Sequence, residues 1–191
     1  MGKYSAGLLL ILALAFTACE RPAPRATEGT ANGFNLSQYL QGQIAAMQTQ
    51  KPMVLKSVST GNQPVETLET DQVDWEDELA VFEQLDLNKP TLQEYYSKRR
   101  LPLEGGGYAI EYRKLKDTEP LVHYLQLNFG PDQKLQQVQA VLQDKNPLFF
   151  SRRKVHLQTD SGNGNISSYR IEGVQKLIFS DSLRFRVDAN L

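Results

Sequence analysis

The strict alternation of apolar and polar residues near the C-terminus constrains the fold of this chain most. In residues 183–188, Leu, Phe and Val alternate with Arg, Arg and Asp. Successive side chains of a β-strand point to opposite faces, so this segment is expected to be a strand with one apolar face. An apolar sheet face must be covered by another element, which excludes a sheet that stands alone in water.

The same period of two recurs from Tyr108 onward and predicts six strands. Residues 134–142 also fit a helical period, but turn-forming residues on both sides favour a strand. In the segment that begins at Tyr169, the expected apolar face includes Leu177 and Phe179. Six strands joined by short loops predict an antiparallel meander. The turns are expected at 117–120, 130–132, 145–147, 161–165 and 181–182.

Two segments before these strands have the period of an amphipathic helix. Residues 36–48 place apolar side chains on one face, and Asn35 is in position to cap the first turn. Asp74 is expected to cap a second helix, in which Trp75 and Phe82 share the apolar face. Trp75 is the only tryptophan of the chain and is predicted to be part of the core.

Shorter patterns complete the folded region. Two β-branched segments, 53–59 and 65–70, flank a turn signal and predict a hairpin. The T-x-x-E spacing that begins at Thr91 predicts a short turn of helix, and residues 101–107 are expected to be a loop. We therefore expect one α+β domain over residues 34–191, a curved antiparallel meander packed on one or two N-terminal helices.

The N-terminus has the pattern of a secretory signal. Lys3 precedes an apolar run over residues 6–16, after which Thr17 and Ala18 lead to Cys19. A membrane-spanning helix needs about 20 apolar residues, so this run is too short to cross a bilayer. The simplest alternative to a special role for Cys19 is an ordinary secretory signal followed by a free or buried thiol.

Residues 16–19 resemble the lipobox of bacterial lipoprotein precursors, with Phe16 at the position where that pattern prefers Leu. The resemblance implies that residues 1–18 are removed as a signal peptide. It also implies a diacylglycerol thioether on the Cys19 sulfur and an acyl chain such as palmitate on its amine. More than one acyl chain would hold the protein firmly at a membrane surface.

Residues 19–33 contain prolines and glycines but no large apolar side chain, which predicts a disordered tether. A flexible coil of this length reaches roughly 20 Å. The membrane is thus the first expected partner, through the lipid on Cys19. We expect a lipid-anchored protein of the bacterial cell envelope, with the outer membrane as its expected location and either leaflet open.

Residue counts exclude several other classes of protein. The chain has 191 residues, of which 21 are basic and 22 acidic, so no basic excess favours nucleic acid as a partner. One cysteine cannot form an internal disulfide, and two histidines leave little material for a Cys/His metal site. No phosphate-binding loop, dinucleotide motif or nucleophile elbow is present. We therefore expect no metal, no cofactor and no catalytic residue.

Charged residues are unevenly distributed along the chain. Nine carboxylates and no basic residue lie between Lys56 and Lys89, and basic triplets occupy 98–100 and 152–154, beside expected turns. Helix capping and solvated surfaces are the main explanation. The functional alternative is an acidic patch for a basic partner, with the triplets facing lipid phosphate or an acidic protein.

The two histidines have different expected environments. His123 falls on the apolar side of its strand, where a buried structural histidine is the simplest interpretation. His156 alternates with Lys154 and is expected to be exposed on the other face. Residues 160–165 resemble a calcium loop only faintly, because glycines replace the oxygen ligands that such a loop needs.

Three functions follow from these patterns. The first is a non-enzymatic, lipid-anchored envelope protein that binds another protein or an envelope component. The second is a carrier or sensor that holds an acyl chain or another apolar ligand between a half-barrel sheet and its helices; this rests on a resemblance in architecture alone to periplasmic lipoprotein carriers. The third is a hydrolase that uses unrecognised acids on the sheet.

Overall fold

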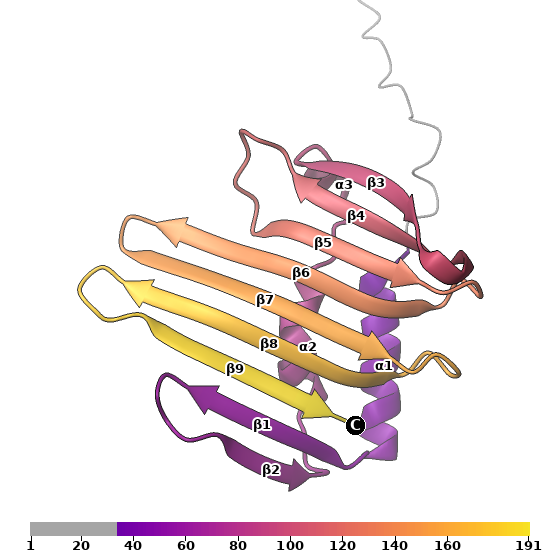
Figure 1. The fold of residues 1–191 in the computed structure, drawn as a ribbon, viewed down its shortest axis with the longest axis horizontal. Coiled ribbons are helices and arrows are strands. Elements are labelled where there is room, and N and C mark those ends of the chain that lie inside the picture. Colours follow the sequence, from indigo (N-terminus) through magenta and orange to yellow (C-terminus); the bar gives the residue numbers. More distant parts are fainter. Residues whose placement is uncertain (1–33) are drawn as a thin grey trace, which may run out of the picture. The chain divides into compact units, whose positions relative to one another are not determined.

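A computed structural model describes residues 34–191, in which nine strands and three α-helices follow one another (Figure 1). The signal sequence, Cys19 and the tether lie outside the described residues. The elements are α1 (Leu36–Gln50), β1 (Val54–Thr60), β2 (Glu66–Thr70), α2 (Trp75–Glu83), α3 (Pro90–Gln93), β3 (Tyr96–Pro102), β4 (Tyr108–Lys114), β5 (Val122–Phe129), β6 (Leu135–Asn146), β7 (Phe149–Thr159), β8 (Ile166–Leu177) and β9 (Leu183–Asn190).

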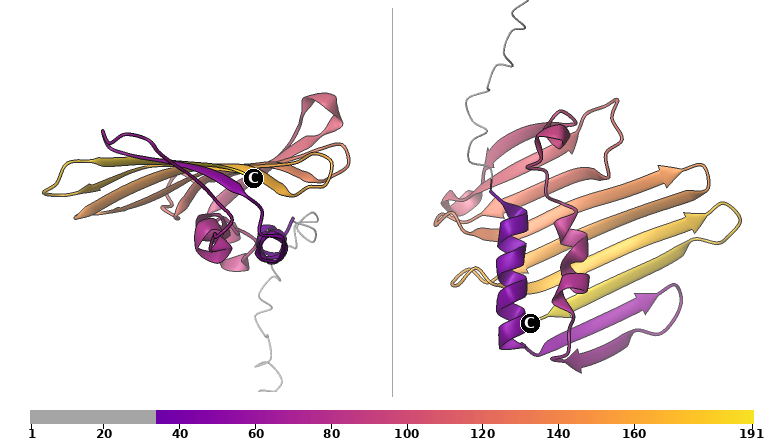
Figure 2. Two further views of the ribbon diagram at one scale, coloured as in Figure 1. Left: turned by 90° about the horizontal axis from the view of Figure 1, so that it is seen from below. Right: turned by 180° about the vertical axis from the view of Figure 1, so that it is seen from behind.

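The nine strands form one open sheet in which every neighbouring pair is antiparallel. Strands β3 to β9 follow chain order, and for β4 to β9 this is the meander that the alternating pattern predicts. The β1–β2 hairpin is added at the other end, where β1 pairs with β9, so Leu55 lies opposite Asn190. An antiparallel sheet accompanied by helices agrees with the expected α+β class. The β3–β4 end of the sheet bends away from the helices (Figure 2).

The two long helices begin where the capping residues predict. The Asn35 side chain accepts a hydrogen bond of 2.9 Å from the backbone N–H of Gln38, and Asp74 accepts from the first turn of α2. Helices α1 and α2 run side by side on one face of the sheet (Figure 2). The Tyr39 hydroxyl of α1 donates to the carbonyl of Gly164, in the turn between β7 and β8. Within residues 34–191, no helix combines the length and hydropathy needed to span a bilayer.

Apolar side chains of the helices and of the sheet are buried. Trp75 is 2% exposed, and its neighbours on the same helix face are buried completely. The Phe82 ring meets the Tyr169 ring of β8 edge to face, with 6.1 Å between the centroids. The largest side chains in this core are Trp75, Phe82, Phe129, Leu40, Leu79, Leu85, Leu125, Leu142 and Leu157.

Two predictions for residues 91–107, a short turn of helix and a loop, are correct only in part. Helix α3 begins at Pro90 with Lys89 as N-cap, because the fixed φ of proline suits the first helical position, and it ends at Gln93. The T-x-x-E pattern at Thr91 therefore caps nothing. Strand β3 then starts at Tyr96 and extends into the expected loop as far as Pro102. This strand lies at the sheet edge, where few side chains are buried and no apolar alternation is needed.

The expected apolar face of β8 is also wrong at its end. The strand stops at Leu177, and Phe179 lies in the turn to β9 with 94% of its surface exposed. Gly173, a second position on the expected apolar face of β8, has no side chain of its own to bury. The Phe185 ring of β9 covers it so closely that a Cβ there would lie 2.3 Å from the ring, so the apolar contact at this position comes from the neighbouring strand.

Candidate binding face

The sheet has one face covered by helices and one face that the helices leave free. Tyr169 points to the covered face, where its hydroxyl donates to Glu78 of α2. The next residue, Arg170, therefore points to the opposite face. We call this second surface the open face. One row across β5 to β9 defines it: Gln126, Gln139, His156, Arg170 and Asp188.

Amide side chains on the open face bind one another across two strands, β5 and β6. Gln126 of β5 donates to Asn128 at 2.8 Å, and Asn128 donates to Gln137 of β6 at 2.7 Å. Gln139 also donates to the Gln137 carbonyl oxygen, at 3.0 Å, and the Tyr124 hydroxyl donates to Gln126. Within residues 34–191, every buried side-chain nitrogen and oxygen has a hydrogen-bond partner. These mutual bonds hold the amide network in one arrangement.

The amide network ends at His156 of β7. The amide nitrogen of Gln137 lies 2.6 Å from Nε2 of His156, and since an amide nitrogen donates, the ring nitrogen accepts. Burial, together with the positive charge of Arg170, lowers the pKa of His156 and favours the neutral ring. His156 shares the face of Lys154, as the alternation predicts. The expectation that it is exposed is wrong, because its neighbours leave it only partly accessible.

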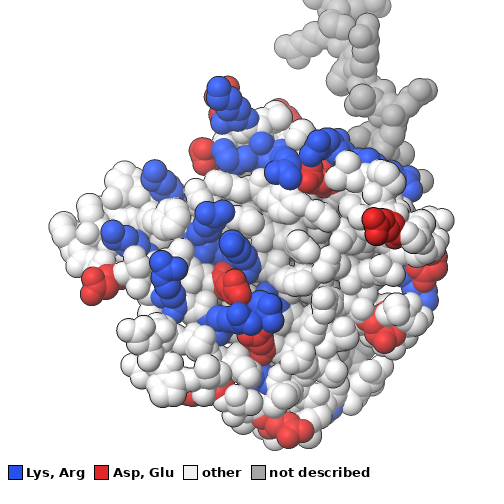
Figure 3. Space-filling view, in the orientation of Figure 1, with Lys and Arg blue, Asp and Glu red and all other residues white. Residues whose placement is uncertain are grey.

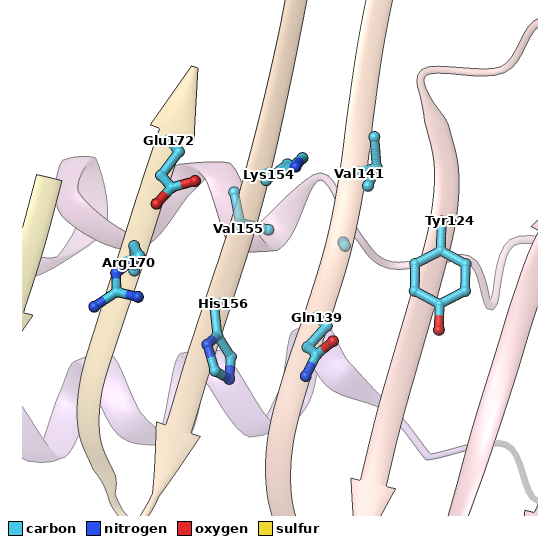
Figure 4. A pocket seen from close by; sticks show the side chains of 9 residues that line it. Tyr124, Gln139, Val141, Lys154, Val155, His156, Arg170 and Glu172 are labelled. Carbon is cyan, nitrogen blue, oxygen red and sulfur yellow. The ribbon is translucent and has the colours of Figure 1, made fainter. Parts of the chain in front are cut away.

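A hollow of about 290 Å³ lies on the open face over β5 to β8 (Figure 4). Lys154, His156 and Arg170 line it, with Gln139 and Tyr124 on the side of the amide network. The rest of the lining comes from Val141, Glu172, Ala140 and Val155. The hollow thus combines two cationic side chains, one neutral imidazole and one carboxylate beside the amide network.

Positive charge predominates on the open face from β7 to β9 (Figure 3). Asp188 accepts from Nε of Arg170 at 2.5 Å and from Nε of Arg186 at 2.6 Å, and these bonds lower its pKa. Glu172 lies 3.3 Å from Arg186. The two carboxylates are therefore already paired with arginine. Among the described side chains of β7 to β9 on this face, six are cationic, namely Arg152, Lys154, Arg170, Lys176, Arg184 and Arg186.

A second charged cluster occupies the β3–β4 end of the open face. Glu111 is 4% exposed and accepts from Nη2 of Arg99 at 2.5 Å and from Nη2 of Arg113 at 2.7 Å. Hydrogen bonds from Arg113 and then Arg99 lower the pKa of Glu111 to about 2. Two guanidinium groups share this single buried carboxylate, so the cluster carries one positive charge in excess.

The strands divide both basic triplets between the two faces, because neighbouring side chains point in opposite directions. Arg99 reaches Glu111 on the open face, whereas Lys98 and Arg100 lie over the rings of Tyr112 and Tyr108. In the second triplet Arg153 donates to Gln84 beside α2, at 3.1 Å. Both triplets lie within strands, β3 and β7. Because neighbouring side chains of a strand point to opposite faces, the three cations of a triplet do not form one cluster.

His123 is not packed against apolar side chains as expected. The pairing of β5 with β6 shifts between Val122 and Tyr124, so Val122 is buried and Leu121 is exposed. The His123 side chain lies 3.5 Å from Glu119 and is partly exposed. Burial and the nearby Lys114 lower its pKa, with the Glu119 charge opposing them.

Asp160 and two of the acidic residues before Lys89 take part in a turn, a helix cap and an ion pair. Asp160 accepts from the backbone N–H groups of Gly162 and Asn163, which is the hairpin turn that the sequence predicts. No group of three or more potential metal ligands occurs in residues 34–191. The nine carboxylates before Lys89 include Asp74, which caps α2, and Glu78, which binds Lys56 at 2.6 Å.

Comparisons with known proteins assign no family to the chain. No protein-family model matches it, and neither a curated protein nor a solved structure does. No motif in the sequence marks Gln137, Gln139 or Arg170 as part of a site. Their signal is the placement of polar residues at every second position of long strands whose other face is apolar, which is how a solvent-facing sheet surface is encoded.

Proposed function

We propose that this chain is a lipid-anchored, non-enzymatic protein of the bacterial cell envelope whose open face binds an anionic envelope component. Anchoring through Cys19, in the outer membrane, is part of this proposal, as is the stabilisation of the sheet by packing on α1 and α2. The observation that carries the proposal is the hollow flanked by Lys154 and Arg170, on a face where carboxylates are fewer than cations.

The ligand class follows from the charges that remain unpaired. Asp188 already binds Arg170 and Arg186, whereas no ion pair joins Lys154 to any described carboxylate. A carboxylate or phosphate group in the hollow would accept from Lys154 and from the free end of the Arg170 guanidinium. Binding of this group would cost little side-chain entropy in the neighbouring amide network, since its own hydrogen bonds already hold that network in place.

The carrier alternative requires an apolar cavity between the sheet and the helices. Trp75, Phe82 and their neighbours fill that layer, which favours the binding protein. A hollow of about 450 Å³ reaches Trp75 at the end of the helices, but Lys51 and Asp71 are among the residues that line it. This lining suits water better than an acyl chain.

The hydrolase alternative gains no support from the carboxylates of the open face. A catalytic acid at neutral pH needs a raised pKa. Arginine side chains lower the pKa of both Glu111 and Asp188 instead. These carboxylates are therefore suited to holding the sheet surface in place.

Co-sedimentation with purified envelope polymers tests the proposed function. Isolated peptidoglycan supplies carboxylates and lipopolysaccharide supplies phosphates. We expect the protein to bind one of them, and we expect the double variant Lys154→Gln, Arg170→Gln to lower the affinity about tenfold, the equivalent of about 1.4 kcal/mol. Asp188 retains Arg186 in this variant, which protects the fold.

The matched control replaces two exposed cations away from the hollow, Lys89→Gln and Lys116→Gln, with the same change in net charge. We expect this control to bind like the unsubstituted protein. Equal loss in both double variants would mean a general charge effect and would contradict a site in the hollow. The absence of binding to either polymer would contradict the proposed ligand class.

A further inference from the structure

Two neighbouring hairpins end in exposed apolar side chains. Leu148 lies in the turn between β6 and β7, and Ile178 and Phe179 lie in the turn between β8 and β9. The backbone N–H of Ile178 donates to the carbonyl of Leu148 at 3.1 Å, so the two turns are side by side. Leu177 and Leu183 flank the second turn and are also exposed. We call these five residues the apolar tip.

The exposure of the apolar tip is unusual for a folded domain. Phe179 is 94% exposed and Leu148 is 64% exposed, so no part of residues 34–191 covers them. Single exposed apolar residues are common, but five large ones on two adjacent turns are not. Such a group of exposed side chains is costly in water and indicates that something else covers it.

Basic residues surround the apolar tip. Lys145 and Lys176 both lie beside Phe150, one position inside the turns, and Arg152 and Arg184 follow two residues further along the strands. All four share the open face and are exposed. The carboxylates nearby are Asp144, Asp181 and Glu119, whose charge interacts with that of Lys145, so the four cations still exceed the carboxylates. A strand rises about 3.3 Å per residue, so the four cations lie within roughly 10 Å of the turns.

From this arrangement we infer that the apolar tip inserts into the interface of a phospholipid bilayer, with the four cations at the level of anionic headgroups. Phe and Leu side chains insert roughly 5–10 Å, to the boundary between headgroups and acyl chains, while Lys and Arg bind the lipid phosphates. A protein partner fits the tip less well, because the core of a protein interface is depleted in lysine and a protruding turn offers little flat area.

The chain before the described residues is compatible with this contact. Residues 19–33 span at most roughly 50 Å when extended, so a lipid on Cys19 would keep the tip within reach of the same bilayer. In this respect the inference rests on the proposed anchor. The insertion itself depends only on residues of the two hairpins.

A fluorophore on either end of the sheet tests the insertion. The full chain is purified in its lipid-modified form, and Ser180→Cys or Ser161→Cys is labelled with an environment-sensitive nitrobenzoxadiazole dye. Ser180 follows Phe179, and Ser161 is equally exposed in the turn between β7 and β8. On vesicles of phosphatidylethanolamine and phosphatidylglycerol, we expect the dye at 180 to shift to the blue. Nitroxide-labelled acyl chains should quench it severalfold more than the dye at 161.

Two further measurements test whether the apolar side chains and the anionic headgroups cause the blue shift and the quenching at position 180. The changes Ile178→Ser and Phe179→Ser, made in the Ser180→Cys chain, should abolish the shift while the lipid keeps the protein on the vesicles. Pure phosphatidylcholine vesicles should weaken the quenching, because they lack anionic headgroups. Equal, water-like emission at 180 and 161 would overturn the inference. So would a blue shift at 180 that needs no vesicles and grows with protein concentration, because it would indicate self-association.

A separate labelling experiment tests whether Cys19 carries the lipid anchor. A chain without engineered cysteines takes up dye only if the Cys19 thiol is free, since Cys19 is its one cysteine. Labelling there would contradict the lipid anchor and leave the insertion testable in a Cys19→Ser background. In that background, blue-shifted and quenched emission at 180 on vesicles would still support the inference, and its absence would refute it.

Discussion

The hydroxyl of Tyr169 on β8 donates a hydrogen bond of 2.5 Å to the carboxylate of Glu78 on α2. The same carboxylate binds Lys56 of β1 at 2.6 Å. Glu78 therefore joins one helix to two strands that are far apart in the sequence. Burial and, to a smaller extent, the bond to Glu78 raise the pKa of Tyr169, so this hydroxyl remains a donor at every physiological pH.

Tyr169→Phe is expected to lower the free energy of unfolding by about 1.5–3 kcal/mol, as is typical of a lost hydrogen bond to a charged group. The ring remains and keeps its contact with Phe82, so only the hydroxyl is removed. Denaturant unfolding measures the difference. Tyr95→Phe is the control, since Tyr95 is exposed, and it should change stability little. Equal effects of the two changes would contradict the role of the Tyr169–Glu78 bond.

Trp75→Ala is expected to cost about 3–5 kcal/mol, a large share of the roughly 5–15 kcal/mol that stabilises a domain. The side chain is 2% exposed and lies on the helix face with Leu79 and Phe82. Its fluorescence should be blue-shifted and should not respond to added fatty acids or lipids. A well-tolerated substitution, combined with lipid-dependent emission, would favour the carrier over the binding protein.

A fragment of residues 34–191 is expected to fold without the rest of the chain. The buried side chains all belong to this segment. The pairing of β1 with β9 also joins its first strand to its last. Thermal unfolding should be cooperative, and circular dichroism should show more strand than helix. An unfolded fragment would show that residues before Phe34 contribute to stability.

Local patterns of the sequence predict most of the elements because each is determined by neighbouring residues. Asn35 and Asp74 mark the helix starts, since a cap acts within one turn. The alternation in residues 183–188 marks β9, since burial of one face requires it. Residues 134–142 fit both a helical and a strand period, and the turn-forming residues on both sides correctly predict a strand, β6.

Features that depend on distant residues could not be predicted in this way. The edge strand β3 has no apolar alternation because neither of its faces is deeply buried. The pairing of β1 with β9 joins the two ends of the folded region, which no local pattern records. Phe179 looks like a core residue in the sequence, and only the end of β8 at Leu177 leaves it in water. For the open face, the sequence indicates polar side chains but not that Gln137 and His156 are hydrogen-bonded.

Cys19→Ser is expected to release the protein from the membrane fraction, because the substitution removes the sulfur that would carry diacylglycerol. The prediction rests on the lipobox-like residues 16–19. Membrane fractionation and labelling with radioactive fatty acid measure the outcome. Retention of the variant in membranes, with fatty-acid labelling unchanged, would contradict lipidation. An unlabelled variant that stays bound would instead indicate that other contacts suffice to hold the protein there.

Glu111 is expected to make stability fall with acidification over a defined range. Its pKa is about 2 in the folded protein, against an ordinary value of 4.5, because Arg113 and Arg99 donate to the charged carboxylate. The unfolded chain therefore binds the proton more tightly, so this stabilisation is complete above pH 4.5 and is lost as the pH falls towards 2. Glu111→Gln should unfold more easily than the unsubstituted protein at neutral pH, because it leaves two guanidinium groups without their carboxylate. The difference in free energy of unfolding between the two proteins should shrink steadily between pH 4.5 and 2, as measured by denaturant titration at each pH. A difference that stays constant over this range would mean that the Arg99–Glu111–Arg113 cluster stabilises the β3–β4 end by packing and not by charge.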